Sequence, residues 1–331
     1  MINQLSAKKN EVLLYLEDFV EGISEKYLKP IETNWQPADL LPDTACLDTF
    51  AEKLKDLQQS AKELSYDFWV VLIGDTVTEE ALPTYESWLA GLNGINIGAP
   101  GGWGEWSRKW TAEENRHGDV LNRYLYLSGR VDMRAVETSV QYLIGDGFDI
   151  QTDDDPYRTF VYTSFQELAT NVSHRRVASL AKKNDNHTLA KICGLIASDE
   201  ARHAKAYKSF VDKIFEVDAN EMMLAFADMM KKRIVMPAHN LREIGSKAGE
   251  AFDSFSDAAQ RLGVYTSSDY IEIFESLIKD WNIANITELD DMGEQARDYI
   301  MNLPERFRRV LSRFKQPELD YEFDWVLPRT Q

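Results

Sequence analysis

Two Glu-x-x-His motifs are the residues of this sequence whose types and spacing most clearly indicate chemistry. They are Glu114–His117 and Glu200–His203. Because residues i and i+3 of an α-helix lie on the same face, each motif presents one carboxylate and one imidazole to a common point. The pair of motifs predicts a site for two metal ions held between helices.

A further glutamate precedes each motif at a similar distance. Glu79 lies before Glu114 and Glu167 lies before Glu200, so the chain repeats one design, Glu followed by Glu-x-x-His. Four helices that project these side chains inward would give each metal one terminal glutamate, one histidine and two shared carboxylates. Exposed helical glutamate is the ordinary alternative, but Glu79 and Glu167 both follow apolar stretches, which favours an inward position.

The ligand types favour particular metals. Four carboxylates neutralise two Fe(II) ions and leave coordination positions open, an arrangement that suits the activation of dioxygen. Thiolate ligands are absent from the set, and zinc sites normally use fewer carboxylates. Iron or manganese is therefore favoured over zinc, copper or magnesium, and we expect two Fe ions (Fe2+/Fe3+) per subunit as the cofactor.

Several neighbouring residues have two interpretations. Glu113 and Asp199 each precede a ligand glutamate, so they would accept the outer N–H of a metal-bound imidazole or simply face solvent. Thr170 lies one turn beyond Glu167 and would place its hydroxyl over the metals or bond back into its own helix. The histidines that fit no ligand pattern are interpreted as structural: His174, His187 and His239.

Long segments with apolar residues at three- and four-residue spacing predict an all-α chain. These segments are 11–29, 47–63, 66–92, 111–128, 132–145, 157–182, 186–214, 219–235, 250–262, 267–280 and 292–314. We expect one domain over residues 1–331, with a ferritin-like di-iron four-helix bundle core at about 66–214. Additional helices follow at about 219–314, before a C-terminal tail at 317–331.

Three local features modify this helical pattern. Pro83 removes the hydrogen bond to the carbonyl of Glu79, which predicts a kink at the first ligand unless that helix begins later. The glycine-rich segment 98–104 predicts a loop. Residues 321–327 alternate in polarity, which is typical of a short strand or hairpin.

Composition excludes several classes of protein. The 331 residues carry 37 basic and 55 acidic side chains, and this net charge of −18 argues against nonspecific nucleic-acid binding. No apolar run is long enough to cross a bilayer, so we expect a soluble protein without membrane insertion. The two cysteines, Cys46 and Cys193, fit a reducing compartment. Basic clusters at 231–233 and 306–315 would meet an acidic partner or are solvated helix faces.

Further stretches of the sequence carry a resemblance to a known family. From about residue 26 to the C-terminus, the chain resembles the soluble acyl-carrier-protein desaturases of the plant stearoyl type, the type 2 family of fatty acid desaturases. The stretches that carry this resemblance include Asn34–Pro37, Gly74–Tyr85, Trp110–Gly118, Tyr124–Met133, Tyr162–Glu167, Asp199–His203, Ala225–Met230, Met236–His239 and Gln260–Tyr265.

The resemblance implies an activity and its partners. It implies a homodimer in which each subunit holds two irons and uses dioxygen and electrons from ferredoxin. The reaction inserts a cis double bond into a saturated acyl chain on acyl carrier protein, between carbons nine and ten of stearoyl in familiar members. The compartment would be the cytoplasm in a bacterium and the plastid stroma in a plant or alga.

The resemblance also assigns roles to residues. It places Glu79 and His117 on one iron, Glu167 and His203 on the other, and Glu114 and Glu200 between them. Trp35 falls at a tryptophan that, with Asp199 and His117, forms a hydrogen-bonded chain to the iron, and Thr170 falls beside the oxygen site. Candidate carrier-docking residues are Lys29 and the run 231–233.

The chain departs from the plant pattern near the substrate channel. The loop between Leu92 and Trp106 is shorter and richer in glycine. Trp88, Gly91 and Leu92 lie on the segment that lines the deep end of the family's channel, and a tryptophan is large for that position. We therefore hypothesise that chain-length preference or double-bond position is shifted from the stearoyl pattern.

Other classes of di-iron protein are alternatives. A ferritin-like ferroxidase uses related helices and ligands without an acyl substrate, but its subunits are usually much shorter. A ribonucleotide reductase small subunit needs a radical tyrosine near the irons and normally an aspartate ligand. An inactive binding protein that retained the fold is a further alternative, although all six ligands are present here. Membrane desaturases are excluded because they need histidine clusters and spanning helices, and this chain has only five histidines.

Overall fold

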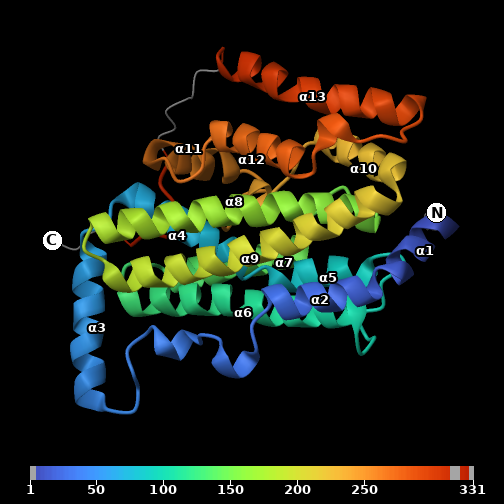
Figure 1. Cartoon of the computed structure of the whole chain (residues 1–331). Coiled ribbons are helices and arrows are strands. Elements are labelled where there is room, and N and C mark those ends of the chain that lie inside the picture. The colour runs from blue at the N-terminus through green and yellow to red at the C-terminus, as the bar shows by residue number, and fades with distance from the viewer. Residues whose placement is uncertain (1–4, 314–320, 328–331) are drawn as a thin grey trace.

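The computed structural model describes residues 5–313 and 321–327, most of which are helical. Four helices form the core of the molecule (Figure 1). They are α4 (Tyr66–Glu79), α6 (Gly102–Ser128), α8 (Pro156–Lys183) and α9 (His187–Val217). Residues 184–186 join α8 to α9, and the two long helices pack side by side. The prediction of an all-α fold with a four-helix core and additional helices is confirmed.

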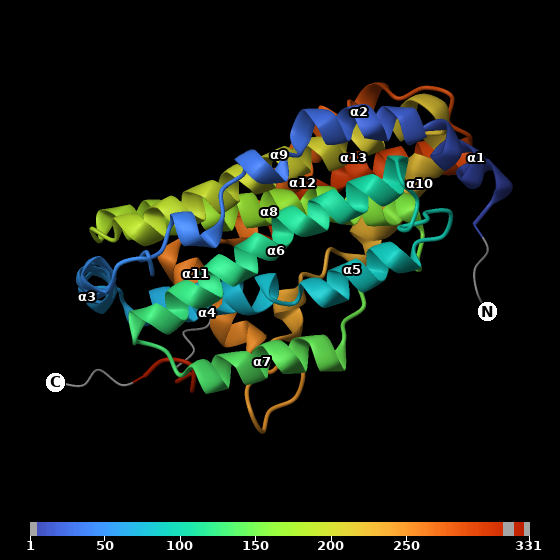
Figure 2. The same ribbon diagram turned by 90° about the horizontal axis from the view of Figure 1, so that it is seen from below.

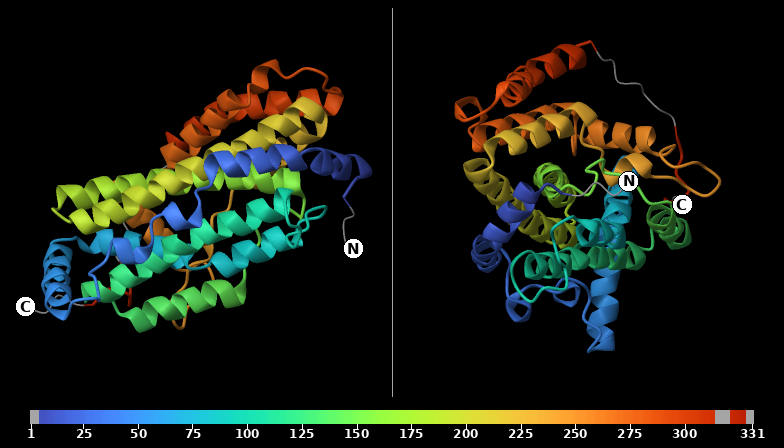
Figure 3. Two further views of the ribbon diagram at one scale, coloured as in Figure 1. Left: turned by 60° about the horizontal axis from the view of Figure 1, so that its bottom comes forward. Right: turned by 90° about the vertical axis from the view of Figure 1, so that its right-hand side faces the viewer.

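The remaining helices cover this core. On one side α10 (Ala219–Lys232), α12 (Ser267–Asp280) and α13 (Asp291–Leu311) form an outer layer, with α10 and α12 packed on α8. The end-on view in Figure 3 places α13 and α3 (Leu47–Lys62) on opposite sides of the molecule. The helices α1 (Ala7–Tyr15) and α2 (Glu17–Tyr27) precede them, and α2 lies along α6 and α9.

The side of α4 carries two more helices. They are α7 (Met133–Asp146), which is seen beside α4 in Figure 2, and α11 (Phe252–Leu262). The short helix α5 (Leu82–Gly91) packs on α6. Four 3-10 turns complete the described helices: η1 (Ile31–Thr33), η2 (Pro37–Asp39), η3 (Pro237–Asn240) and η4 (Ile283–Asn285). None of the described helices combines the length and apolar character that a bilayer span requires.

The predicted helix 66–92 is divided at the first candidate ligand. α4 ends at Glu79, and α5 begins at Leu82 with Pro83 in its first turn. Pro83 has no N–H to donate to the Glu79 carbonyl, and the chain turns instead through hydrogen bonds to Thr76 and Thr78. Instead of the predicted kink, the helix breaks completely, and Glu79 is the last residue of α4.

Helix α6 begins earlier than the predicted boundary at residue 111. The backbone N–H of Gly102 donates to the carboxylate of Glu21 on α2, and that of Trp103 donates to Glu17 on the same helix. Both hydrogen bonds are 3.2 Å long. Anionic groups at a helix N-terminus satisfy its free N–H groups and its dipole. Gly102 also has a φ of +50°, where glycine is the ordinary residue. In the glycine-rich segment 98–104, residues 98–101 thus form a loop and residues 102–104 belong to α6.

The predicted C-terminal hairpin is not present in residues 321–327. These residues contain only an isolated antiparallel bridge between Val131 and Val326. Their alternating pattern has another cause, because Phe323 and Trp325 are both buried and stack on each other. The indole N–H of Trp325 donates to Ser139 on α7 over 2.9 Å. Alternate residues therefore anchor the tail on α7 without forming a sheet. Residues 317–320 and 328–331 of the predicted tail lie outside the described residues.

Asp269 links the outer layer to the core, and its replacement by asparagine tests that link. The Asp269 carboxylate receives two hydrogen bonds of 2.6 Å from Arg176 on α8 and caps α12 through the backbone and hydroxyl of Thr266. Burial alone would raise the pKa of Asp269, but these hydrogen bonds outweigh it and hold the pKa below its ordinary value. We expect Asp269→Asn to lower the free energy of unfolding by about 2 kcal/mol at pH 7.

The pH dependence of this effect has a definite sign. A lowered pKa in the folded state contributes stability above the pKa of the unfolded state, about 3.9, and that stability is lost as the pH falls through the folded-state pKa. Denaturant unfolding of both proteins should show the full difference at pH 7 and a smaller one below about pH 4. Glu305→Gln, at an exposed ion pair with Arg309, should change little. An equal loss in both variants would contradict the assignment.

Candidate metal centre

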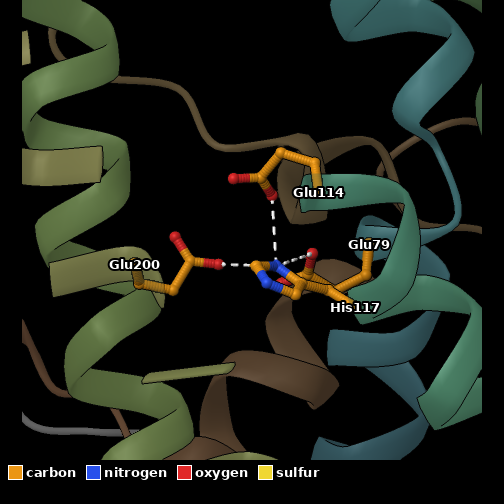
Figure 4. A group of neighbouring side chains, drawn as sticks. All are labelled: Glu79, Glu114, His117 and Glu200. Atoms are coloured by element: carbon orange, nitrogen blue, oxygen red, sulfur yellow. Dashed lines mark ion pairs between the residues drawn. The ribbon is translucent and has the colours of Figure 1, made fainter. Parts of the chain in front are cut away.

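The structure brings the six predicted ligand side chains together inside the bundle. Two groups form, and within each group the ligating atoms all lie within 4.8 Å of one another. The first group, drawn in Figure 4, contains Glu79, Glu114, His117 and Glu200. The second contains Glu114, Glu167, Glu200 and His203. Glu114 and Glu200 belong to both groups, as expected of carboxylates shared between two metals.

The four core helices position these groups through their apolar packing. α4 supplies Glu79, α6 and α9 supply one Glu-x-x-His motif each, and α8 supplies Glu167. His117 and His203 have no exposed surface, and Glu167 and Glu200 are 2% exposed. Four carboxylates in one buried place are unfavourable without a counter-charge. The cluster therefore has the character of a cation site rather than of a solvated surface.

Unpaired atoms in the cluster fit the predicted metals. Buried atoms without a hydrogen-bond partner among the described residues include Nδ1 of His117 and His203, one oxygen of Glu114 and one of Glu167. These atoms lie against one another, with His203 Nδ1 2.6 Å from Glu114 and His117 Nδ1 3.2 Å from Glu200, but none has a well-formed hydrogen bond, and such buried polar atoms are costly unless something binds them. Imidazole nitrogens with several carboxylate oxygens form the ligand set that iron uses in non-haem sites. The residues present thus fit two iron ions.

The electrostatics of the cluster point the same way. Burial raises the pKa of Glu167 well above its ordinary value, and the charges of Glu200 and Glu114 add to this. Burial would lower the pKa values of His117 and His203, but Glu114 and the other carboxylates outweigh it and raise both. Burial likewise opposes ionisation of Glu114, yet the two histidines hold its pKa at about 2. Without metal the cluster retains protons that bound cations would replace.

Each imidazole has an acidic partner on the opposite helix. His203 Nε2 on α9 lies 2.9 Å from Glu113 on α6, and His117 Nε2 on α6 lies 3.5 Å from Asp199 on α9. Arg202 donates a hydrogen bond of 2.7 Å to Glu113 and one of 2.6 Å to Asp199. The carboxylates leave Nδ1 of each ring directed toward the ligand groups. Glu113 and Asp199 are both buried and both face an imidazole, so neither lies on a solvated surface; their role toward a metal-bound histidine stays a prediction.

Trp35 extends this arrangement outward. Its indole N–H donates to Asp199 over 2.9 Å, and its ring stacks on His117 with centroids 6.1 Å apart. Arg116 lies over the same indole ring, 4.5 Å from its centroid. The half-buried Trp35 is thus hydrogen-bonded to Asp199, whose carboxylate lies 3.5 Å from His117 Nε2.

The terminal and shared carboxylates are also held by neighbours. Trp110 donates its indole N–H to Glu167 over 3.0 Å. The hydroxyl of Thr170 lies 3.1 Å from the carbonyl of Gln166, in its own helix, and 2.8 Å from Glu200. Its hydroxyl is close to one of the two shared ligands.

His174, interpreted from the sequence as structural, contacts the candidate site. Its Nε2 lies 2.8 Å from Glu79, and the ring is 2% exposed. The adjacent Ser173 donates to Asp75 on α4 over 2.9 Å. A signal for this contact was present in the spacing, because Glu167, Thr170 and His174 follow one another at three and four residues on one face of α8. His187 and His239 belong to neither ligand group.

A cavity of about 840 Å³ extends from the carboxylate cluster to the outer helices. Its inner end includes Glu79, Glu114, Glu167, Glu200 and Thr170. Its walls continue along mostly polar residues of α8 and apolar residues of α11 and α12 to the end of α10 and to α13. This volume is typical of a site for a large organic ligand. An organic molecule that occupies this cavity would therefore lie next to the carboxylate cluster.

The three residues predicted at the deep end of a channel do not line this cavity. Its wall in α5 is formed by Leu82 and Tyr85. Trp88 packs behind Tyr85 with ring centroids 5.2 Å apart, and it also contacts Phe148 at 4.5 Å. Gly91 and Leu92 follow Trp88 at the end of α5. Trp88, Gly91 and Leu92 are thus not among the residues that line this cavity, and their place at the deep end of a substrate channel stays a prediction.

Comparison with known proteins places the chain in a family. The fatty acid desaturase family model matches residues 8–327. The chloroplastic stearoyl-[acyl-carrier-protein] 9-desaturase of Spinacia oleracea is 49% identical over 99% of this chain and 83% of its own length. A chloroplastic palmitoyl-[acyl-carrier-protein] 4-desaturase of Ophrys sphegodes is 46% identical over the same shares.

A solved structure shares the fold. DesA2 of Mycobacterium tuberculosis H37Rv, assigned as an acyl-ACP desaturase, has a TM-score of 0.52 and 20% identity, and the match covers 83% of this chain and 96% of that one. The matches in sequence span almost the whole described chain, including all six residues of the two ligand groups. The chain belongs to the type 2 family of fatty acid desaturases.

Proposed function

We propose that this protein is an oxygen-dependent acyl-[acyl-carrier-protein] desaturase that inserts a cis double bond into a saturated acyl chain. The observation that carries the proposal is the two-group carboxylate and histidine cluster at the inner end of an 840 Å³ cavity. Relatives that are 46–49% identical are desaturases of stearoyl or palmitoyl chains on this carrier. They support this reading and not the ferroxidase alternative.

The six residues of the cluster would hold two iron ions, with Glu114 and Glu200 shared. When bound, the irons supply with dioxygen the oxidising power that removal of hydrogen from unactivated methylenes requires. The chain's own residues position the ligands: Glu113 and Asp199 orient the imidazoles, while Trp110 and His174 orient Glu167 and Glu79. These supports act on ligands from all four core helices.

The cavity would determine which carbons meet the cluster. Its apolar walls exclude water from the acyl chain and hold the reacting methylenes beside the shared carboxylates. Thr170 is the one hydroxyl on the cavity wall that contacts a shared carboxylate among the described residues, so we assign it a place beside the oxygen site. Its role is to offer a hydrogen bond inside an otherwise acidic cluster.

The remaining partners follow from family membership. We propose acyl carrier protein as the bearer of the substrate, ferredoxin as the electron donor, a homodimer as the assembly, and the plastid stroma or the bacterial cytoplasm as the compartment. The path from Trp35 through Asp199 to His117 supports electron entry on the α2 side. Lys29 is a weaker docking residue than expected, because its ammonium lies 3.7 Å from Asp199.

A direct assay tests the proposed function. Iron-loaded protein receives stearoyl and palmitoyl chains on acyl carrier protein, ferredoxin-derived electrons and oxygen, and the fatty acids are then analysed by mass spectrometry. A product two hydrogens lighter, with its double bond mapped, is the expected result. Oxygen consumption without any altered acyl chain would contradict the proposal and favour an oxidase or ferroxidase.

A further inference from the structure

Gly118 lies where α6 meets the end of α4, directly after the candidate ligand His117. A Cβ atom at Gly118 would lie 3.1 Å from the carbonyl carbon of Glu79 and 3.1 Å from the backbone nitrogen of Glu80. Ordinary contacts of a Cβ atom lie between 3.4 and 4 Å. The peptide that joins Glu79 to Glu80 therefore packs directly on the backbone of α6, in a space that glycine leaves open.

Glycine is otherwise unfavourable at this position. It lies inside a helix of 27 residues, where alanine has the higher helix propensity. Gly145 in α7 and Gly194 in α9 show the contrast, because no described atom of another segment lies within 4 Å of the place that their Cβ would take. A methyl group would fill open space at those two glycines, whereas at Gly118 it would push against the end of α4.

The end of α4 depends on such contacts more than the middle of a helix does. Glu79 is the last residue of α4, and α5 begins only at Leu82. Glu167, the corresponding glutamate of the second ligand group, lies inside the 28-residue helix α8 with helical residues on both sides. Of these two glutamates, Glu79 is the one whose backbone is held from one side by its helix and from the other by packing.

A small displacement of Glu79 matters to the first ligand group. One oxygen of Glu79 lies 3.8 Å from Nδ1 of His117, and Figure 4 shows the two side chains next to each other. Extending the 3.1 Å contacts at Gly118 to ordinary length requires a shift of about 0.3 Å. Distances between a metal and its ligands are held within about 0.2 Å. One methyl group at Gly118 is therefore enough to disturb a ligand.

We propose that Gly118 is a positioning residue of the metal centre, which lets the end of α4 approach α6 and so sets the place of Glu79 relative to His117. The inference rests on the proposed function, because it requires metal in the cluster, and it gives a role to a residue without a ligating side chain. The second group does not use this contact, since Glu167 and His203 come from α8 and α9, which pack along each other. The effect is confined to the first metal position.

Titration of the metal-free full chain with Fe(II) tests this role. We expect Gly118→Ala to bind one iron with the affinity of the parent and the other roughly tenfold more weakly, as for the loss of a support around a ligand. Gly194→Ala is the matched control, because it makes the same change in α9 where a Cβ has room, and it should bind both irons as the parent does. Metal-free Gly118→Ala should remain folded, since the break between α4 and α5 can absorb the shift.

Three double variants show whether Gly118 acts through Glu79. In a Glu79→Gln background, Gly118→Ala should cause no further loss at the first position, whereas in a Glu167→Gln background the two losses should add. Glu80→Ala removes the carboxylate oxygen that lies 2.9 Å from the same Cβ place, but it leaves the two backbone contacts. It should therefore not restore iron binding to Gly118→Ala.

Each other outcome is decisive. The role is wrong if Gly118→Ala weakens both positions equally, weakens neither, or adds its loss to that of Glu79→Gln. Restoration by Glu80→Ala would assign the effect to the Glu80 side chain, and a metal-free Gly118→Ala that is unfolded at room temperature would assign it to core packing. A parent protein that binds no iron contradicts the proposed function itself. If the parent and Gly118→Ala bind two irons equally well, the proposed function stands without this inference.

Discussion

Glu200→Gln will abolish metal binding at both positions, whereas Glu79→Gln will affect only one. Glu200 belongs to both ligand groups, while Glu79 belongs to the first group alone. Neutral glutamine keeps the side-chain size and the contact with Thr170, but it removes a shared anionic ligand. We expect the loss of iron affinity to exceed about 100-fold, the upper range for removal of an outer hydrogen-bond partner. Iron content per subunit and desaturase activity measure the effect.

The stability of the metal-free protein is the control for misfolding. The charge of Glu200 helps to raise the pKa values of Glu79 and Glu167, so the carboxylates repel one another without metal. Metal-free Glu200→Gln should therefore melt no lower than the metal-free parent. A lower melting temperature would mean that the variant is damaged in its fold. Retention of one tightly bound iron would show that Glu200 is not shared.

The candidate ligands were predictable because they depend on local geometry. The i, i+3 spacing of each Glu-x-x-His motif determines which side chains share a face, and the apolar residues around it determine which face turns inward. Glu113 and Asp199 were predictable for the same reason, as neighbours of the motifs. Their pairing across helices, with Glu113 on His203 and Asp199 on His117, required the structure.

His174 shows where local geometry is insufficient. Its spacing from Glu167 placed it on the correct face of α8, but its contact is with Glu79 on another helix. Only the packing of α8 against the end of α4 brings the two side chains together. The cavity was unpredictable for a similar reason, since its wall combines residues from α4 to α13 that no single pattern connects.

The predicted element boundaries were wrong where contacts between distant segments, rather than local sequence signals, determine where an element begins or ends. Gly102 begins α6 because carboxylates from α2 satisfy its N-terminus, a contact between segments far apart in the chain. The alternation of Phe323 and Trp325 was interpreted as a strand, although it reflects their burial against α7. Pro83, whose effect lies within its own backbone, gave a break at the expected position.

Trp88→Ala will shift the preferred acyl chain toward greater length. Trp88 does not line the cavity, but it fills the space behind Tyr85 and contacts Phe148. Its removal lets Tyr85 move back and extends the apolar space at α5. Two more buried methylenes contribute about 1.6 kcal/mol, which corresponds to about a 15-fold change in relative kcat/KM. Competition between palmitoyl and stearoyl chains on the carrier, with double-bond mapping, measures this ratio directly.

A matched variant and the wild-type product together decide this interpretation. Phe148→Ala removes another ring that contacts both Tyr85 and Trp88, so it should shift the ratio in the same direction. Tyr126→Ala, at an exposed ring far from the cluster in sequence, should leave the ratio unchanged. If wild-type protein already prefers stearoyl and the ninth carbon, the hypothesis of a shifted specificity is wrong. If Trp88→Ala also leaves the ratio unchanged, then Leu82 and Tyr85 form the wall without support from the rings behind them, and those rings serve only to stabilise the fold.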